Sequence, residues 1–198
     1  MKSDVCTLSH DSADLYRILD EVEKTAQYNR LDKKETGRLR LLAEELIGMI
    51  PELLEFGSGT FWTESDGKTY ELHVSLTPAE TMNSERREKL LAVSSSGKNA
   101  AAVGIMNKIR IAAELMMLDY AEVSAEIPLA CEFYNMGMTT MPMSLENSWS
   151  LNAYRVQAKK EKTEAWDELE KSIIANIADD VLVGIQGKRV DIIVKKTF

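Results

Sequence analysis

The chain has 198 residues, a net charge of −8, 44% hydrophobic residues and 28% charged residues. This length and composition are typical of one globular domain with a sizeable core. The acidic balance, with basic residues scattered along the chain, argues against non-specific binding to nucleic acid or to anionic membranes. No apolar stretch approaches the roughly 18 residues that a membrane-spanning helix needs.

Cysteine and histidine are too few and too widely spaced to predict a tetrahedral metal site. The chain contains Cys6, Cys131, His10 and His73. Two distant thiols are typical of reduced cysteines in a cytosolic protein, and residues 1–4 lead into polar residues and not into an apolar signal core. We therefore expect a cytoplasmic protein without a bound metal.

The first part of the sequence predicts two amphipathic helices. Apolar residues recur at helical spacing over about 12–28 and again up to Ile50, beyond which Pro51 should kink or end the second helix. Asp32, followed three residues later by Glu35, predicts a capping box at the start of this second helix.

A change to period-two alternation then predicts a β-hairpin. The pair Asp66-Gly67 is a strong turn signal between strands over about 60–64 and 69–76. The second strand should place apolar side chains on one face and polar side chains on the other, wetter face: Tyr70, Leu72, Val74 and Leu76 against Glu71, His73 and Ser75. Without a second histidine or a cysteine nearby in sequence, His73 is expected to be exposed or hydrogen-bonded and not a ligand or a base.

The middle of the chain predicts a short helix over about 84–93, a polar loop and a longer helix. The longer helix carries an apolar stripe between Ala102 and Met116, with Asn99 as a candidate N-cap. Residues 119–160 read as an irregular insertion with one or two strands, one of them over Trp149 to Val156.

The last part predicts a helix and a second hairpin. A charge run over 159–162 introduces a helix from about Thr163 to Ala178, and strands over 181–185 and 189–194 follow. The tryptophans should anchor the interface between sheet and helices, because each can bury a large apolar area: Trp62, Trp149 and Trp166. The order of elements predicts one α+β domain over residues 1–198, with a largely antiparallel or mixed sheet covered on one face by helices.

The loop before the longer helix is the strongest candidate for a ligand site. Ser95, Ser96, Gly97, Lys98 and Asn99 combine backbone N–H groups, a lysine and a helix start, which together suit an anion. The spacing is not that of a P-loop, since Ala92 stands in place of the first glycine. A polar connector between two helices explains the same residues.

These pieces, in this order, resemble the ATP-binding fold of the GHKL superfamily, in particular its anti-sigma-factor serine kinases. In that branch a helix ends with a glutamate and, four residues later, an asparagine that holds Mg²⁺. A strand then leads to an Asp-x-Gly-x-Gly adenine loop, and a glycine-rich lid opens onto another helix. A terminal strand closes the sheet. The resemblance covers residues 12–118 and 163–198.

The resemblance assigns Glu45 to the glutamate, the candidate base that polarises an attacking hydroxyl or water. Four residues later stands Met49, whose thioether is a poor Mg²⁺ ligand because that ion prefers hard oxygen donors. After the first hairpin, residues 76–80 supply neither the aspartate nor the glycines of the adenine loop. The lid corresponds to the loop that contains Lys98. A solvated acidic edge is the alternative explanation for Glu44 and Glu45.

Three hypotheses follow. The first is a regulatory or partner-binding protein on a degenerate ATP-binding fold, with weak or no nucleotide turnover, whose partner is another protein or a second copy of the chain. The second is an active ATP-dependent protein serine kinase or ATPase, with ATP and Mg²⁺ as cofactors, Glu45 as base and Lys98 on phosphate. It needs other oxygens for Mg²⁺, for which the sequence offers Glu44, Glu80 and Asn83. The third is an unrelated α+β binding domain whose insertion is the contact surface.

Overall fold

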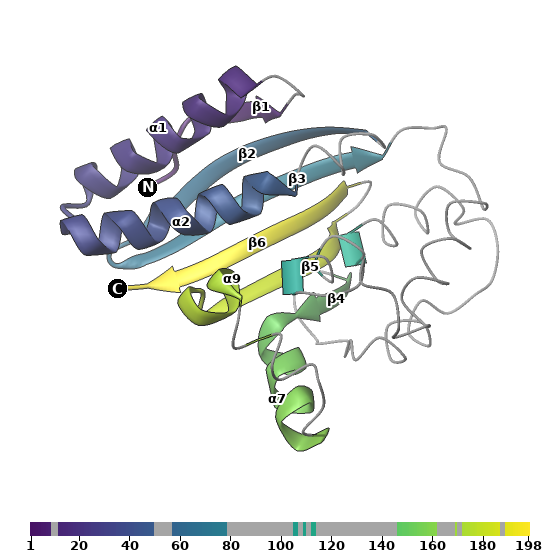
Figure 1. Cartoon of the computed structure of the whole chain (residues 1–198). Helices are drawn as coiled ribbons and strands as arrows, with labels where there is room; N and C mark the ends of the chain where they lie inside the picture. Colours follow the sequence, from purple (N-terminus) through teal and green to yellow (C-terminus); the bar gives the residue numbers. More distant parts are fainter. Residues whose placement is uncertain are drawn as a thin grey trace.

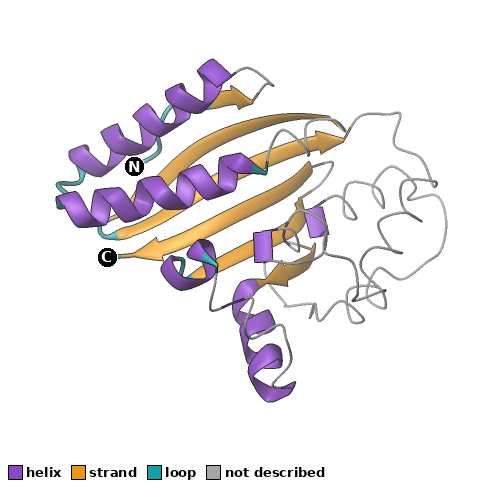
Figure 2. Cartoon of the chain, in the orientation of Figure 1, coloured by secondary structure: helices purple, strands orange, loops and turns teal. Residues whose placement is uncertain are grey.

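The described elements form two layers, an antiparallel sheet of six strands and a layer of helices on one face of it (Figure 1). The computed structural model of the chain describes residues 1–8, 12–49, 57–78, 146–161, 172–186 and 189–198, together with residues 105, 106, 109, 112, 113 and 169. Helices and strands are segregated into separate layers in these parts (Figure 2). The predicted α+β fold, with an antiparallel sheet covered on one face, is confirmed.

Two antiparallel helices, α1 (Ser12–Tyr28) and α2 (Lys33–Gly48), cover one half of the sheet. The capping box is present as predicted: the Asp32 carboxylate accepts from the backbone N–H of Glu35, and the Glu35 side chain accepts from the N–H of Asp32. The apolar stripes of both helices face the sheet, where these side chains are buried: Ile18, Leu19, Val22, Ala26, Leu39, Leu42, Ala43 and Leu46.

The predicted first hairpin consists of β2 (Gly57–Asp66) and β3 (Thr69–Pro78). Gly67 occupies the turn at a φ of 59°, a backbone conformation that glycine adopts without strain. The apolar residues of β3 pack against the helices and are fully buried, as the alternation predicts: Tyr70, Leu72, Val74 and Leu76.

The second hairpin, β5 (Asp180–Gln186) and β6 (Arg189–Thr197), joins the first through its last strand. The sheet order is β1-β2-β3-β6-β5-β4, and every neighbouring pair is antiparallel. The strand closest to the C-terminus therefore lies in the middle of the sheet, beside β3 (Figure 1).

One strand at the sheet edge has no counterpart in the sequence prediction. The strand β1 (Cys6–Leu8) pairs with β2, with Cys6 and Leu8 buried and Thr7 exposed. Three alternating residues carry too weak a periodic signal to predict a strand, and β2 supplies the pairing that stabilises them.

The predicted strand over Trp149 to Val156 is wrong beyond Ser150. The strand β4 (Glu146–Ser150) ends there, and α7 (Leu151–Glu161) follows immediately. The Ser150 hydroxyl accepts from the N–H of Ala153, which makes Ser150 the helix N-cap. Leu151, Tyr154 and Ala158 are buried at helical spacing, so packing favours the helix. The charge run over 159–162 therefore begins within the last turn of α7, and the residues that follow Glu161 lie outside the described residues.

Within the predicted helix from Thr163 to Ala178, the structure describes residue 169, which is helical, and the short helix α9 (Ile173–Ile177). The Ser172 side chain accepts from the N–H of Ala175, so α9 has its own N-cap and does not continue an earlier helix through this point. Arg155 of α7 donates to the carbonyl oxygens of Ala175 and Ala178, which ties the end of α9 to α7.

Other sequence predictions fall largely or wholly outside the described residues. These are the helix over 84–93, the loop that contains Lys98, and most of the insertion over 119–160, of which β4 and α7 are the described part. The longer helix of the middle region is supported at five positions, since residues 105, 106, 109, 112 and 113 are helical. Among the described residues, no helix is long and apolar enough to cross a membrane.

Two glycines give a matched test of the packing. Leu8, Gly59 and Leu76 lie in register on β1, β2 and β3, and a Cβ on Gly59 would lie 2.9 Å from Leu8 Cδ1 and 3.0 Å from Leu76 Cδ2. Because both leucines are buried, we expect Gly59→Ala to lower the free energy of unfolding by about 1–3 kcal/mol. A Cβ on Gly37, within α2, meets nothing within 4 Å. Gly37→Ala should raise stability by about 0.5–1 kcal/mol. Urea unfolding measures both, and equal stability of Gly59→Ala and the wild type would contradict this packing.

Candidate functional site

The site implied by the sequence resemblance lies at the C-terminal end of α2. Glu45 is half-buried in the last turn, and Met49 is the C-cap residue of the helix. The Met49 side chain is 6% exposed and belongs to the hydrophobic core. The other predicted ligand residues, Ser95, Ser96, Gly97, Lys98 and Asn99, lie outside the described residues, so the structure does not place them relative to Glu45.

The neighbouring glutamate, Glu44, is part of an ion-pair network between the two helices. Arg40 Nε donates to Glu44 Oε1 at 2.9 Å, and Arg40 also pairs with Glu23 of α1. These side chains are about 40% exposed. For Glu44, the structure therefore agrees with a solvated acidic edge, the alternative to a catalytic base.

A second group of polar residues gathers on the face of the sheet that lies opposite the helices. Because β2 and β3 pair antiparallel, Trp62 lies opposite His73 and Glu64 lies opposite Glu71. The strand β6 adds Lys195 opposite Glu71. We call Lys2, Trp62, Glu64, Glu71, His73 and Lys195 the polar-face cluster.

Trp62 organises the centre of this cluster. Its ring stacks on the imidazole of His73, with centroids 4.8 Å apart and planes 5° from parallel. Its indole N–H donates to Glu64 Oε1 at 2.8 Å, and Lys2 Nζ lies 4.4 Å from the ring centroid. The prediction that Trp62 lies between sheet and helices is therefore wrong, whereas Trp149 is buried as predicted. Trp166 lies outside the described residues.

Two lysines compensate the facing carboxylates of Glu64 and Glu71. Like charges directly opposite each other on paired strands destabilise a sheet. Lys2 Nζ lies 3.2 Å from Glu64 Oε1, and Lys195 Nζ lies 2.9 Å from Glu71 Oε1. The indole N–H of Trp62, followed by Lys2, holds the pKa of Glu64 below its usual value. The cluster thus carries no net charge when His73 is neutral.

His73 is buried, contrary to the expectation of a wetter face. It is 9% exposed, and Ser75 on the same face is 4% exposed. His73 Nε2 lies 3.3 Å from Glu71 Oε2, but it makes no hydrogen bond with the described residues. Burial lowers the pKa of His73 below its usual value, despite the opposing effect of Glu64 and Glu71. At neutral pH this side chain is a neutral imidazole.

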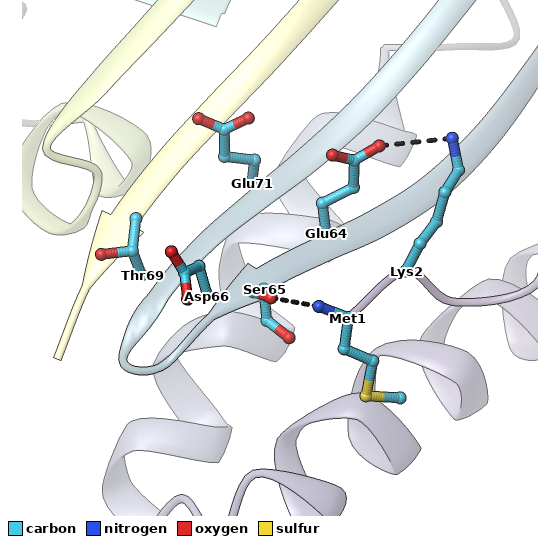
Figure 3. Close-up of a pocket in the computed structure, with 7 residues that line it drawn as sticks. All are labelled: Met1, Lys2, Glu64, Ser65, Asp66, Thr69 and Glu71. Atoms are coloured by element: carbon cyan, nitrogen blue, oxygen red, sulfur yellow. Dashed lines mark hydrogen bonds and ion pairs between the residues drawn. The ribbon is translucent and has the colours of Figure 1, made fainter.

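The cluster borders a surface hollow of about 580 Å³ at the turn end of the first hairpin. Figure 3 shows the carboxylates of Glu64 and Glu71 on adjacent strands, with Lys2 reaching Glu64. The lining residues are Met1, Lys2, Glu64, Ser65, Asp66, Thr69 and Glu71. The hollow therefore combines carboxylates with a lysine, next to a buried imidazole.

Part of this cluster was encoded in the sequence. A two-residue turn after Asp66 sets the hairpin register, and this register alone places Glu64 opposite Glu71 and Trp62 opposite His73. Lys2 and Lys195 could not be predicted in the same way, because each reaches the cluster only through strand pairing outside the hairpin.

The buried imidazole makes a prediction about pH. Unfolded His73 binds a proton near pH 6.5, whereas folded His73, surrounded by Glu64, Glu71, Lys2 and Asp191, binds one only at lower pH. The unfolded state therefore binds more protons in this window, and the free energy of unfolding should fall as the pH drops below about 6.5.

Urea unfolding between about pH 7 and pH 5, with a chelator present, measures this dependence. We expect a shallower slope of unfolding free energy against pH in His73→Gln than in the wild type. His10 is unchanged in both proteins, so it does not contribute to the difference between them. Equal slopes would contradict the assignment to His73.

Comparison with known proteins does not assign this chain to a family: no family model matches it, and no curated protein matches it. The relation to the GHKL superfamily therefore stays a prediction from the sequence. It depends on the order of elements and on the residues at the end of α2.

Proposed function

We propose that this chain is a regulatory, partner-binding protein on a histidine-kinase-like ATPase fold that has lost magnesium-nucleotide chemistry. The observation that carries the proposal is the burial of Met49 in the core, one helical turn after Glu45. The resemblance requires an oxygen ligand for Mg²⁺ at this position.

The order of the elements supports this proposal. The helix with Glu45 and Met49 is followed by a hairpin, then by helical residues between 105 and 113, and finally by a strand that completes the sheet. This is the order that the resemblance implies. A partner-binding role does not depend on the superfamily assignment, because it uses the surface and not the nucleotide site.

The outer surface of α1 supports the choice of a protein as the partner. Tyr16 and Tyr28 are 72% and 74% exposed, and Leu41 of α2 is also exposed. Tyrosine is enriched at protein interfaces, since it offers a large apolar ring and a hydroxyl at low cost in conformational entropy. The occupant of this surface is another protein or a second copy of the chain.

Titration with ATP and Mg²⁺ tests the loss of nucleotide chemistry. We expect the wild-type protein to bind the magnesium nucleotide no more tightly than the millimolar range in calorimetry, since no oxygen ligand stands at position 49. Affinity in the micromolar range would contradict the proposal.

Substitution at the same position shows whether Met49 acts as a core residue. Met49→Asn should lower the free energy of unfolding by about 2–5 kcal/mol, because it replaces a buried apolar side chain by a polar one. Met49→Leu, the matched control, should cost less than about 1.5 kcal/mol. Equal destabilisation by the two substitutions would argue against a core role.

An ATP-dependent protein serine kinase or ATPase is the second candidate. The observation that favours it is Glu45, a half-buried carboxylate at the end of α2 that has no ion pair or hydrogen bond within the described residues. If this candidate is correct, Glu45→Ala and Lys98→Ala should each lower a measured phosphotransfer rate by about 10²-fold or more. Glu21→Ala is the control, since Glu21 lies on α1 and is paired with Lys24. Unchanged rates in both variants would exclude this mechanism.

A further inference from the structure

We propose that Glu64, Glu71 and His73 form a binding site for one divalent transition-metal cation, for which Zn²⁺ is the best match. The ligand-type atoms of these three side chains all lie within 4.8 Å of one another. All three come from the β2–β3 hairpin, so the paired strands hold them together without help from a loop.

His73 is the residue that distinguishes this group from an ordinary acidic surface cluster. The residue is 9% exposed, and its Nε2 is a buried atom that has no hydrogen-bond partner among the described residues. A buried polar atom without a partner destabilises the folded state, and a bound cation would remove this cost. The stacked Trp62 ring fixes the plane of the imidazole, and Nε2 faces the carboxylate of Glu71.

The spacing of the donors agrees with a small tetrahedral ion. Two ligands at tetrahedral zinc, each about 2.0–2.1 Å from the metal, lie about 3.3 Å apart. His73 Nε2 and Glu71 Oε2 are already 3.3 Å apart. The longest separation in the group, 4.8 Å, must shorten by about 1.5 Å to reach that geometry. Rotation of the Glu64 side chain, which is 42% exposed, can provide this movement.

The hydrogen bonds already present leave one oxygen of each glutamate for the cation. Lys195 binds Glu71 Oε1, and both Lys2 and the Trp62 indole bind Glu64 Oε1. Within the described residues, Glu64 Oε2 has no such contact. A group that binds one oxygen of a carboxylate orients the other oxygen towards a metal. Lys195 would have this role for Glu71, and Lys2 and Trp62 would have it for Glu64.

The kind of donor selects the kind of cation. A neutral imidazole with two carboxylates suits Zn²⁺, whereas Mg²⁺ and Ca²⁺ prefer sites made of oxygen alone. Three protein ligands leave a fourth position at a tetrahedral ion. Glu64 and Glu71 line the surface hollow, so this position would open towards it and take a water molecule or a group from a partner (Figure 3).

Calorimetric titration of the tag-free, chelator-treated full chain with zinc chloride tests the proposal. We expect one Zn²⁺ per chain in the wild type. Glu71→Gln and His73→Gln should each weaken binding by more than about 100-fold, beyond the usual effect of losing a group that only supports a ligand. Absence of zinc binding in the wild type, or wild-type affinity in both variants, would overturn the proposal.

Glu44→Gln is the matched control, because Glu44 is also a partly exposed glutamate in an ion pair but lies on α2. It should bind Zn²⁺ as the wild type does, and a comparable loss of affinity would indicate non-specific binding and overturn the proposal. Circular dichroism checks that each variant is folded. If His73→Gln does not fold, the zinc affinity of Glu64→Gln tests the proposal instead. This variant should fold, since an amide at this half-exposed position keeps the shape of the side chain. Its affinity should also fall by more than about 10-fold.

The absorption spectrum of the Co²⁺ complex provides an independent measurement. Coordination by imidazole and carboxylate gives no thiolate-to-metal charge-transfer band, whereas a site built on Cys6 or Cys131 would give one. We expect the wild-type complex to give a spectrum of bound Co²⁺ without that band. In Glu71→Gln this spectrum should disappear. A thiolate band in the wild type would overturn the proposed ligand set.

Discussion

The pairing of β3 with β6 is the interaction on which the rest of the structure depends. Thr69 and Thr197, at one end of this ladder, are 128 residues apart in sequence. An isolated two-stranded hairpin is marginally stable in water, so each hairpin needs the other to extend the sheet. Their pairing also brings Val74 opposite Ile192, both fully buried, and so completes the apolar face on which the helices pack.

The two faces of this sheet differ in polarity and in what they contribute to the protein. The face towards α1, α2 and α9 is apolar and close-packed, and its contribution to stability comes from apolar area removed from water. The opposite face carries Glu64 and Glu71, whose carboxylates are paired with Lys2 and Lys195, and also His73. Strict alternation of apolar and polar residues in the β2–β3 hairpin supplies both faces, because successive side chains point to opposite sides of the sheet.

The end of α2 and the far face of the sheet differ in the donor atoms that their side chains offer. At the end of α2, where the resemblance implies a magnesium ligand, a thioether lies in the core. On the far face of the sheet, hard carboxylate donors and an imidazole lie together, away from the helix layer. A search for function that considers only the end of α2 would therefore miss the group of side chains with the strongest coordinating chemistry in the described part of the chain.

Local pattern determined most of the elements, and tertiary contacts decided the rest. The sequence alone predicts α1, α2, both hairpins and the fold class, because their periodicity, the Asp32 cap and the Gly67 turn act within a few residues. The sequence prediction of a strand at α7 is wrong, because Ser150 and the residues after it fit either a strand or a capped helix. Burial of Leu151 and Tyr154 in the core favours the helix. The hairpin turn also places Glu64 opposite Glu71. Only the folded chain brings Lys2 and Lys195 to these glutamates and buries His73, because strand pairing between segments far apart in sequence leaves no local signal.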